Sequence, residues 1–300
     1  MPLTTSEDYA ARVAAHWASV NDTVRSFWQS PVVMAEVNRR ITGDPDVTPL
    51  EYFRRSYCPQ PRGLGLSLGS GDGQLEIAAV ESGICERIIG IDIAPERVRR
   101  ATERIPAHLR DRVSFVCENL ETFRPDEQFD VIFAKSILHH IEALESWCEA
   151  FNVLLGAGGL LYVDDFIGPS RFQWTDNQIY VINRLLDALP EPLRRDLVLG
   201  DGSPRAPVAR PNVERFIAAD PSEAIRSFDI GFVLETELEP VELKDCGGAL
   251  YHQFFNRIMG NFGDDPALVR MVMEVDFLLT DIGALDPNYL WGVYRPRAGR

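Results

Sequence analysis

The chain has 300 residues, of which 45% are hydrophobic and 25% charged, as in an ordinary soluble globular protein. Its formal net charge of -15 argues against a nucleic-acid partner, because phosphate binding needs clustered Lys and Arg. No apolar run approaches the ~18 residues of a membrane span, the N-terminus lacks an apolar signal segment, and the five cysteines are scattered, so we expect a cytoplasmic protein with reduced thiols.

Residues 1–60 are predicted to form a mainly helical N-terminal segment. Apolar and aromatic side chains recur there at three- and four-residue steps, namely Tyr9, Val13, Trp17, Val20, Val24, Phe27 and Trp28. Such a face either packs as a layer against the sheet edge or forms a wall over a cofactor pocket, and the sequence favours neither. Pro45 and Pro49 mark the expected hinge to the core.

Residues 63–92 (GLGLSLGSGDGQLEIAAVESGICERIIGID) read as a strand, a glycine-dense turn, a helix and a second strand that ends on Asp92. Glycines let the backbone approach a ligand that a Cβ would exclude, and a carboxylate at a strand tip can accept hydrogen bonds from both hydroxyls of a ribose. The glycines fall as GxGxG, whereas a dinucleotide fingerprint would need glycine where the chain has Gln74. This spacing argues against an NAD-dependent oxidoreductase.

After this unit, strands and helices alternate, which predicts a parallel sheet with helices on both faces. The expected strands cover 113–117, 129–136 and 160–163, and the expected helices cover 94–105 and 137–155. Beyond Phe166 the alternation ends. Helices are predicted over 172–189, from Asp220 onward, and in two apolar stripes over 251–262 and 268–279, with strands over 232–243 and 289–294.

The glycine turn resembles motif I of the class I S-adenosylmethionine (SAM) dependent methyltransferases, and Asp92 matches their ribose-binding acidic residue. Such proteins often carry Asp or Glu where this chain has Ser67, which implies a weaker or water-mediated contact to the methionine amino group. The segments PVVMAEVNRRITGDP, LSLGSGDG, DDFIGPSRFQWTDNQ, DPSEAIRS and GGALYHQFFNRIMGNF extend the resemblance over nearly the whole chain. They are similar to a bacterial group that acts on hydroxyls of carbohydrates or small metabolites.

The resemblance implies an α/β fold with a Rossmann-like seven-stranded sheet, mostly parallel with an antiparallel last strand, flanked by helices. The expected organisation is an N-terminal helical segment (1–60), a SAM-binding core (61–166), a substrate-binding and lid region (167–288), and the last strand with the tail (289–300). About 50 residues between the last two strands are expected to form a helical lid above the carboxyl ends of the strands.

SAM is the expected cofactor. The resemblance places a polar side chain against the adenine amino group, which is Asn119 here, with Glu118 as the alternative. The predicted cofactor-binding residues are Gly69, Ser70, Gly71, Gly73, Asp92, Ile93, Asn119, Leu120 and Lys135.

Methyl transfer is an in-line displacement in which the acceptor must lie ~3 Å from the methyl carbon, and a hydroxyl acceptor benefits from a base. His139 and Asp165 are the predicted catalytic residues, since imidazole titrates near neutral pH and Asp165 ends a strand at the same cleft. The structural alternative is helix capping for His139 and capping of the following turn for Asp165. A carboxylate here could also ligate a divalent metal with a neighbour, although no metal is predicted.

His140, Asp164, Arg171 and Trp174 are the predicted substrate contacts, because an aromatic plane can stack on a sugar ring and a guanidinium suits phosphate or carboxylate. Further candidates are Arg205, Arg210 and His252; a solvated loop charge is favoured for Arg205 and a structural role for His252.

The predicted function is SAM-dependent methylation of a hydroxyl on a saccharide or polyhydroxylated small molecule. The alternatives are N-methylation of a small amine or amino sugar, an NAD-dependent oxidoreductase, or a noncatalytic SAM-binding module. The predicted partner is the small-molecule or saccharide substrate, with no nucleic acid and no membrane, and a homodimer stays open.

Overall fold

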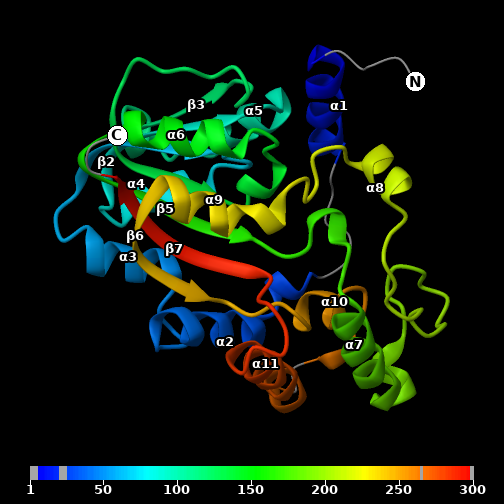
Figure 1. Ribbon diagram of the computed structural model, residues 1–300. Coiled ribbons are helices and arrows are strands. Elements are labelled where there is room, and N and C mark those ends of the chain that lie inside the picture. The colour runs from blue at the N-terminus through cyan, green and yellow to red at the C-terminus, as the bar shows by residue number, and fades with distance from the viewer. Residues whose placement is uncertain (1–5, 20–25, 264–265, 298–300) are drawn as a thin grey trace.

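The computed structural model describes residues 6–19, 26–263 and 266–297. Its centre is a seven-stranded sheet in the order β3-β2-β1-β4-β5-β7-β6 (Figure 1). The strands are β1 (Arg62–Leu68), β2 (Cys85–Asp92), β3 (Val113–Cys117), β4 (Phe129–Lys135), β5 (Leu155–Phe166), β6 (Leu238–Asp245) and β7 (Tyr289–Pro296).

Strand β7 runs antiparallel to both of its neighbours, β5 and β6, while β1 to β5 pair in parallel. The predicted Rossmann-like sheet with an antiparallel last strand is therefore confirmed. The chain moves outward from β1 to β3 and then returns to β4 on the other side of β1. Ligands of open α/β sheets bind at such a reversal, at the carboxyl ends of the strands.

Helices cover both faces of the sheet because side chains along each strand alternate between them. Ile132 and Ala134 of β4 pack in one cluster with Phe151 of α6 (Leu144–Leu154) and Leu234 of α9 (Ile230–Glu237). Phe133 points to the opposite face, which is covered by α3 (Pro49–Tyr57) and α4 (Gln74–Glu81), while α5 (Pro95–Arg104) contacts β2 and β3. Both faces of the parallel strands are thereby buried.

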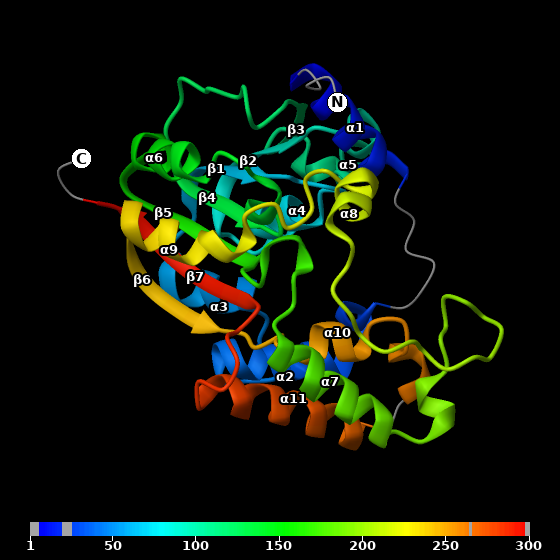
Figure 2. The same ribbon diagram turned by 45° about the vertical axis from the view of Figure 1, so that its right-hand side comes forward.

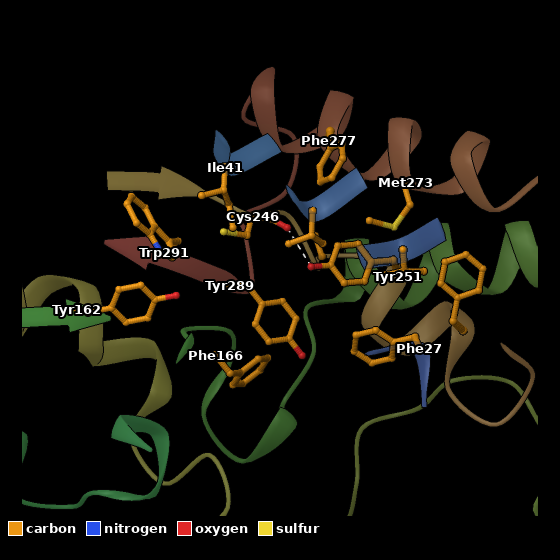
Figure 3. Packing of buried hydrophobic residues seen from close by; sticks show 14 of the residues in the cluster. Phe27, Ile41, Tyr162, Phe166, Cys246, Tyr251, Met273, Phe277, Tyr289 and Trp291 are labelled. Carbon is orange, nitrogen blue, oxygen red and sulfur yellow. Dashed lines mark hydrogen bonds between the residues drawn. The ribbon is translucent and has the colours of Figure 1, made fainter. Parts of the chain in front are cut away.

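A further helical layer lies beyond the carboxyl end of β6. It contains α2 (Pro31–Thr42), α7 (Asp176–Ala188), α10 (Tyr251–Phe255) and α11 (Pro266–Asp281), which run side by side at the bottom of Figure 2. Aromatic side chains join this layer to the sheet (Figure 3): Tyr251 stacks on Tyr289, and its hydroxyl donates to the backbone oxygen of Cys246 at 2.9 Å.

Two more helices lie away from this layer. Helix α1 (Ser6–Ser19) contacts α5, and α8 (Val213–Ala219) lies near the end of α1 in both ribbon views. Short 3-10 helices fill the connections at Phe27–Gln29, Ala107–Leu109, Leu138–His140, Ser170–Phe172, Glu191–Arg194, Ser227–Asp229 and Met259–Phe262. None of the helices in the described ranges is long and apolar enough to cross a membrane.

Several predicted elements differ from the structure. Asp220 ends α8 instead of starting a helix, because its Oδ1 accepts from the backbone N–H of Ser222 and closes a local turn. Residues 232–237 belong to α9 and not to a strand, since Ile230, Val233 and Leu234 are buried at helical spacing. The helix predicted over 137–155 is a 3-10 turn followed by α6, and the stripe over 251–262 is divided between α10 and a 3-10 turn. The prediction for Val20 and Val24 lies outside the described residues.

Candidate functional site

A cavity of about 270 Å³ lies at the carboxyl ends of β1, β2 and β4, where the strand order reverses. Part of its wall consists of predicted cofactor residues: Gly69, Asp92, Ile93, Asn119, Leu120 and Lys135. The rest comes from α1, α5, α6 and the loops that follow β4 and α8, with Trp17, Arg97, Ile137, His140, Trp147 and Ser222 among its residues.

The glycine turn is shaped by close packing as well as by backbone conformation. Gly69 has a φ of +64°, and a Cβ there would lie 2.6 Å from the Cδ1 of Ile137. Gly73 has a φ of +83°, and a Cβ there would lie 2.6 Å from the ring of Phe115. Side chains at either position would therefore strain the backbone and displace a neighbour. The predicted residues Ser70, Gly71 and Gly73 build this turn and are not part of the cavity wall.

Asp92 joins the second strand to the turn. Its Oδ2 accepts from the backbone N–H of Gly71 at 2.9 Å, and its Oδ1 accepts from that of Ala94 at 2.8 Å. Burial raises the pKa of the carboxyl, and the two backbone donors oppose this rise. Each carboxylate oxygen keeps a second lone pair, so Asp92 can still accept a hydrogen bond from a ribose hydroxyl at the cavity wall.

Of the two residues considered for adenine, Asn119 lies on the cavity wall. Its Oδ1 accepts from the backbone N–H of Glu121 at 3.0 Å, which orients the amide. The amide oxygen keeps one lone pair for an amino group, as the adenine assignment requires.

Helix α1 closes one side of the cavity with Val13 and Trp17. The Arg97 guanidinium lies 4.7 Å from the centre of the Trp17 ring, and its Nε donates to the backbone oxygen of Trp17 at 3.1 Å. Nε2 of His16 lies 3.3 Å from Oδ2 of Asp220. The sequence left two roles open for the N-terminal apolar face, and the structure shows both. Helix α1 forms a wall over the pocket, whereas Phe27 packs into the core beside Tyr251.

His139 and Asp165 form a buried pair next to the cavity, with His139 Nδ1 2.5 Å from Asp165 Oδ1. The Asp165 oxygens also accept from the backbone N–H groups of Ile137, Leu138 and Phe166, and the residue is 1% exposed. Asp165 therefore lies behind His139 and orients it, instead of facing the cleft as predicted. Burial lowers the pKa of His139, but the Asp165 carboxylate outweighs burial and the net shift is upward.

His140 and Glu223 complete this end of the site. The Nδ1 of His140 lies 3.2 Å from Ser222 Oγ, and burial holds its pKa well below the usual range. The Glu223 carboxylate faces both histidines, with Oε1 3.9 Å from His139 Nε2 and Oε2 4.0 Å from His140 Nε2. Sequence reasoning missed Glu223, although it lies in the quoted segment DPSEAIRS, because that segment was assigned to a helix.

The remaining predicted substrate residues have structural partners. Asp164 pairs with Lys135 across β4 and β5. Arg171 donates from Nη1 to the backbone oxygen of Glu223 at 2.8 Å and so holds the loop that carries this residue. Trp174 is 2% exposed and stacked on Phe172 at 5.0 Å, so the prediction that it stacks on a sugar ring is wrong for this conformation.

The other candidates are also structural. Arg210 donates to the backbone oxygen of Trp174, and Arg205 donates to those of Gln253 and Phe254. His252 is hydrogen-bonded to the Tyr289 hydroxyl at 2.7 Å, and burial lowers its pKa to about 3. The predicted lid does not form part of the cavity wall. None of the described residues between 246 and 288 lines the cavity.

Comparison with known proteins supports the assignment of the core. Residues 66–161 match the model of a methyltransferase domain. No curated protein sequence matches the chain.

Solved structures that resemble the chain include the [4+2]-cyclase SpnF, with 16% identity, a TM-score of 0.47 and coverage of 93% of this chain and 86% of that one. A SAM-dependent methyltransferase from Mesorhizobium loti shows 16% identity and a TM-score of 0.47, covering 82% and 96%. Phosphoethanolamine N-methyltransferase 2 from Haemonchus contortus, in complex with SAM, shows 12% identity and a TM-score of 0.51, covering 98% and 59%. At such identities the likeness concerns the fold alone.

Residues 66–161 are thus a methyltransferase domain, and its sheet order and glycine turn with Asp92 are of the Rossmann-like type. A methyltransferase domain of this fold implies an enzyme with SAM as its cofactor.

Proposed function

We propose that the enzyme transfers the SAM methyl group to a hydroxyl of a saccharide or a polyhydroxylated small molecule. In this proposal SAM occupies the cavity between Gly69, Asp92 and Asn119. The acceptor enters next to His140 and Ser222, which line the same cavity and adjoin His139 and Glu223. The acidic net charge of -15 supports a small-molecule acceptor over a nucleic acid.

The observation that carries the proposal is the His139–Asp165 pair. A hydroxyl is a poor nucleophile until it loses its proton, whereas a neutral amine needs no base. Nδ1 of His139 donates to the buried carboxylate of Asp165, so its Nε2 is the atom that can accept a proton. In the proposed step the hydroxyl proton moves to Nε2, the oxygen bonds to the methyl carbon, and the carbon–sulfur bond of SAM breaks.

A second candidate is N-methylation of a small amine or amino sugar. The carboxylates of Asp220 and Glu223 lie at the acceptor end, and they would attract an ammonium group. Mass spectrometry of the methylated product separates the two candidates, because it identifies the acceptor atom.

The test is a transfer assay with radiolabelled SAM across saccharides, polyols and small amines. With a methylated hydroxyl compound in hand, we expect His139→Ala and Asp165→Asn to lower kcat by roughly 10²- to 10⁴-fold while the Kd for SAM changes little. His108→Ala on the surface is the matched control, and we expect it to retain full activity. If both site variants keep the wild-type rate, the base lies elsewhere or proximity alone suffices.

A further inference from the structure

Three metal-ligating side chains converge beside the cofactor cavity. The imidazoles of His139 and His140 and the carboxylate of Glu223 each offer a ligand atom, and these atoms lie within 4.8 Å of one another. Glu223 Oε1 is 3.9 Å from His139 Nε2, and Oε2 is 4.0 Å from His140 Nε2. Both separations are too long for a hydrogen bond, but they are below about 4.2 Å, which is twice a typical Zn–N or Zn–O distance.

The hydrogen bonds of the two histidines determine which nitrogen carries the proton. The Ser222 hydroxyl donates to Asp220 Oδ1 at 2.8 Å, so Ser222 Oγ accepts from Nδ1 of His140 at 3.2 Å. On His139, Nδ1 faces the Asp165 carboxylate and is therefore the donor. In the neutral imidazoles both Nε2 atoms then present a lone pair toward the Glu223 carboxylate. Three electron-pair donors facing one another repel, and either a proton on His139 or a cation between the three side chains relieves this repulsion.

The surroundings resemble the outer shell of a metal site. Metal-ligating histidines usually donate their other ring N–H to a carboxylate or another acceptor, which fixes the orientation of the ring. Asp165 fills this role for His139, and Ser222 fills it for His140. The backbone oxygen of Glu223 accepts from Arg171 Nη1 at 2.8 Å, so the loop that carries the third side chain is also held from outside the cluster.

We propose that His139, His140 and Glu223 bind one divalent transition-metal ion, with Zn²⁺ as the representative case. Two imidazoles and one carboxylate suit Zn²⁺ and its first-row neighbours better than Mg²⁺ or Ca²⁺, which prefer oxygen ligands. Three protein ligands leave a coordination position open, as in catalytic zinc sites. Because His140 lies on the cavity wall, the ion would adjoin the cofactor cavity.

The inference rests on the proposed function and changes one step of it. An acceptor hydroxyl on the ion becomes more acidic, as water does on Zn²⁺, and releases its proton to solvent. The alkoxide then takes the methyl group as the carbon–sulfur bond of SAM breaks. His139 acts here as a ligand, so the ion replaces it as the cause of hydroxyl deprotonation.

The test measures Zn²⁺ binding to the full chain by calorimetry after treatment with a chelator, without SAM or acceptor. We expect one equivalent of Zn²⁺ for the wild type and at least tenfold weaker binding for His140→Asn and for Glu223→Gln. His108→Asn is the matched control, because its Nε2 lies 3.8 Å from the Glu81 carboxylate at the surface, and we expect wild-type binding from it. Circular dichroism of the chelator-treated proteins checks that the variants fold.

Equal Zn²⁺ affinity in the wild type, His140→Asn and Glu223→Gln overturns the proposal, and so does a wild type that binds no Zn²⁺. A visible Co²⁺ spectrum of imidazole-ligated character, lost in His140→Asn, supports it. Activity separates the two proposals: methylation of a hydroxyl by the chelator-treated enzyme at the full rate overturns the role of the ion in deprotonation and leaves the proposed function intact. Stoichiometric Zn²⁺ binding with no methylation of any hydroxyl compound overturns the proposed function alone.

Discussion

Glu76 offers a quantitative test of the energetics of the cofactor-binding unit. This residue of α4 is 0% exposed, and neither carboxylate oxygen has a hydrogen-bond partner among the described residues. Burial raises its pKa to about 7 from 4.5, and the Ser67 hydroxyl opposes the rise although it forms no hydrogen bond of standard geometry with the carboxyl. Ser67, which stands where the family motif often has an acid, is 1% exposed and is not on the cavity wall. Its polar neighbour is the buried Glu76 carboxyl.

The sign of the effect follows from proton binding. In the unfolded chain Glu76 loses its proton near pH 4.5, whereas in the folded protein it keeps the proton until about pH 7. The folded state therefore binds more protons between these values, and its stability falls as the pH rises through this window. A shift of about 2.5 pKa units corresponds to about 3 kcal/mol at 1.36 kcal/mol per unit. Glu76→Gln removes this penalty because glutamine has no proton to lose.

The measurement is urea unfolding of the wild type and Glu76→Gln between pH 4 and pH 8. We expect the variant to gain about 3 kcal/mol relative to the wild type between pH 4.5 and pH 8, so that the difference curve rises with pH. Glu81→Gln is the control on the same helix, since Glu81 is exposed and we expect its substitution to change the free energy of unfolding by less than about 0.5 kcal/mol. A flat difference curve for Glu76→Gln refutes the argument, because it means that burial imposes no charge penalty at this position.

Three further changes test the site and its supports. Asp92→Ala should abolish SAM binding measured by calorimetry while the circular dichroism spectrum stays that of the wild type. Unchanged affinity for SAM would refute the assignment of Asp92 to the ribose. Trp17→Ala should weaken SAM binding about 2- to 10-fold by freeing α1 from Arg97, whereas Arg100→Ala on the exposed side of α5 should not. Asp276→Ala should lower the free energy of unfolding by about 3 kcal/mol or more, because three buried N–H groups lose their acceptor; loss below about 1 kcal/mol would contradict this account.

The cofactor half of the protein could be predicted from the sequence because its determinants are local. The glycines from Gly69 to Gly73, the apolar strands on either side and the acid at Asp92 lie within 30 residues of one another. The turn itself requires positive φ values and leaves no room for a Cβ, so the glycines in the sequence mark these positions directly. The alternation of strands and helices likewise predicted the sheet that the structure shows.

The acceptor half depends on contacts between distant parts of the chain. Alternation along a strand shows that Asp164 and Asp165 point to opposite faces, but only packing decides that Asp165 lies behind His139. A cluster of large aromatic rings buries Trp174, although the sequence analysis predicts that this side chain contacts the substrate.

The sequence alone therefore determined the fold class and the residues around the glycine turn, and its resemblance to a known family predicted the cofactor. Only the tertiary structure placed α1 over the cavity and brought Glu223 to within 4.0 Å of both histidines from more than 80 residues away. The physical reason is that burial, ion pairs and proton positions depend on which segments meet in space. The periodicity and spacing of residues within one segment do not predict these long-range contacts.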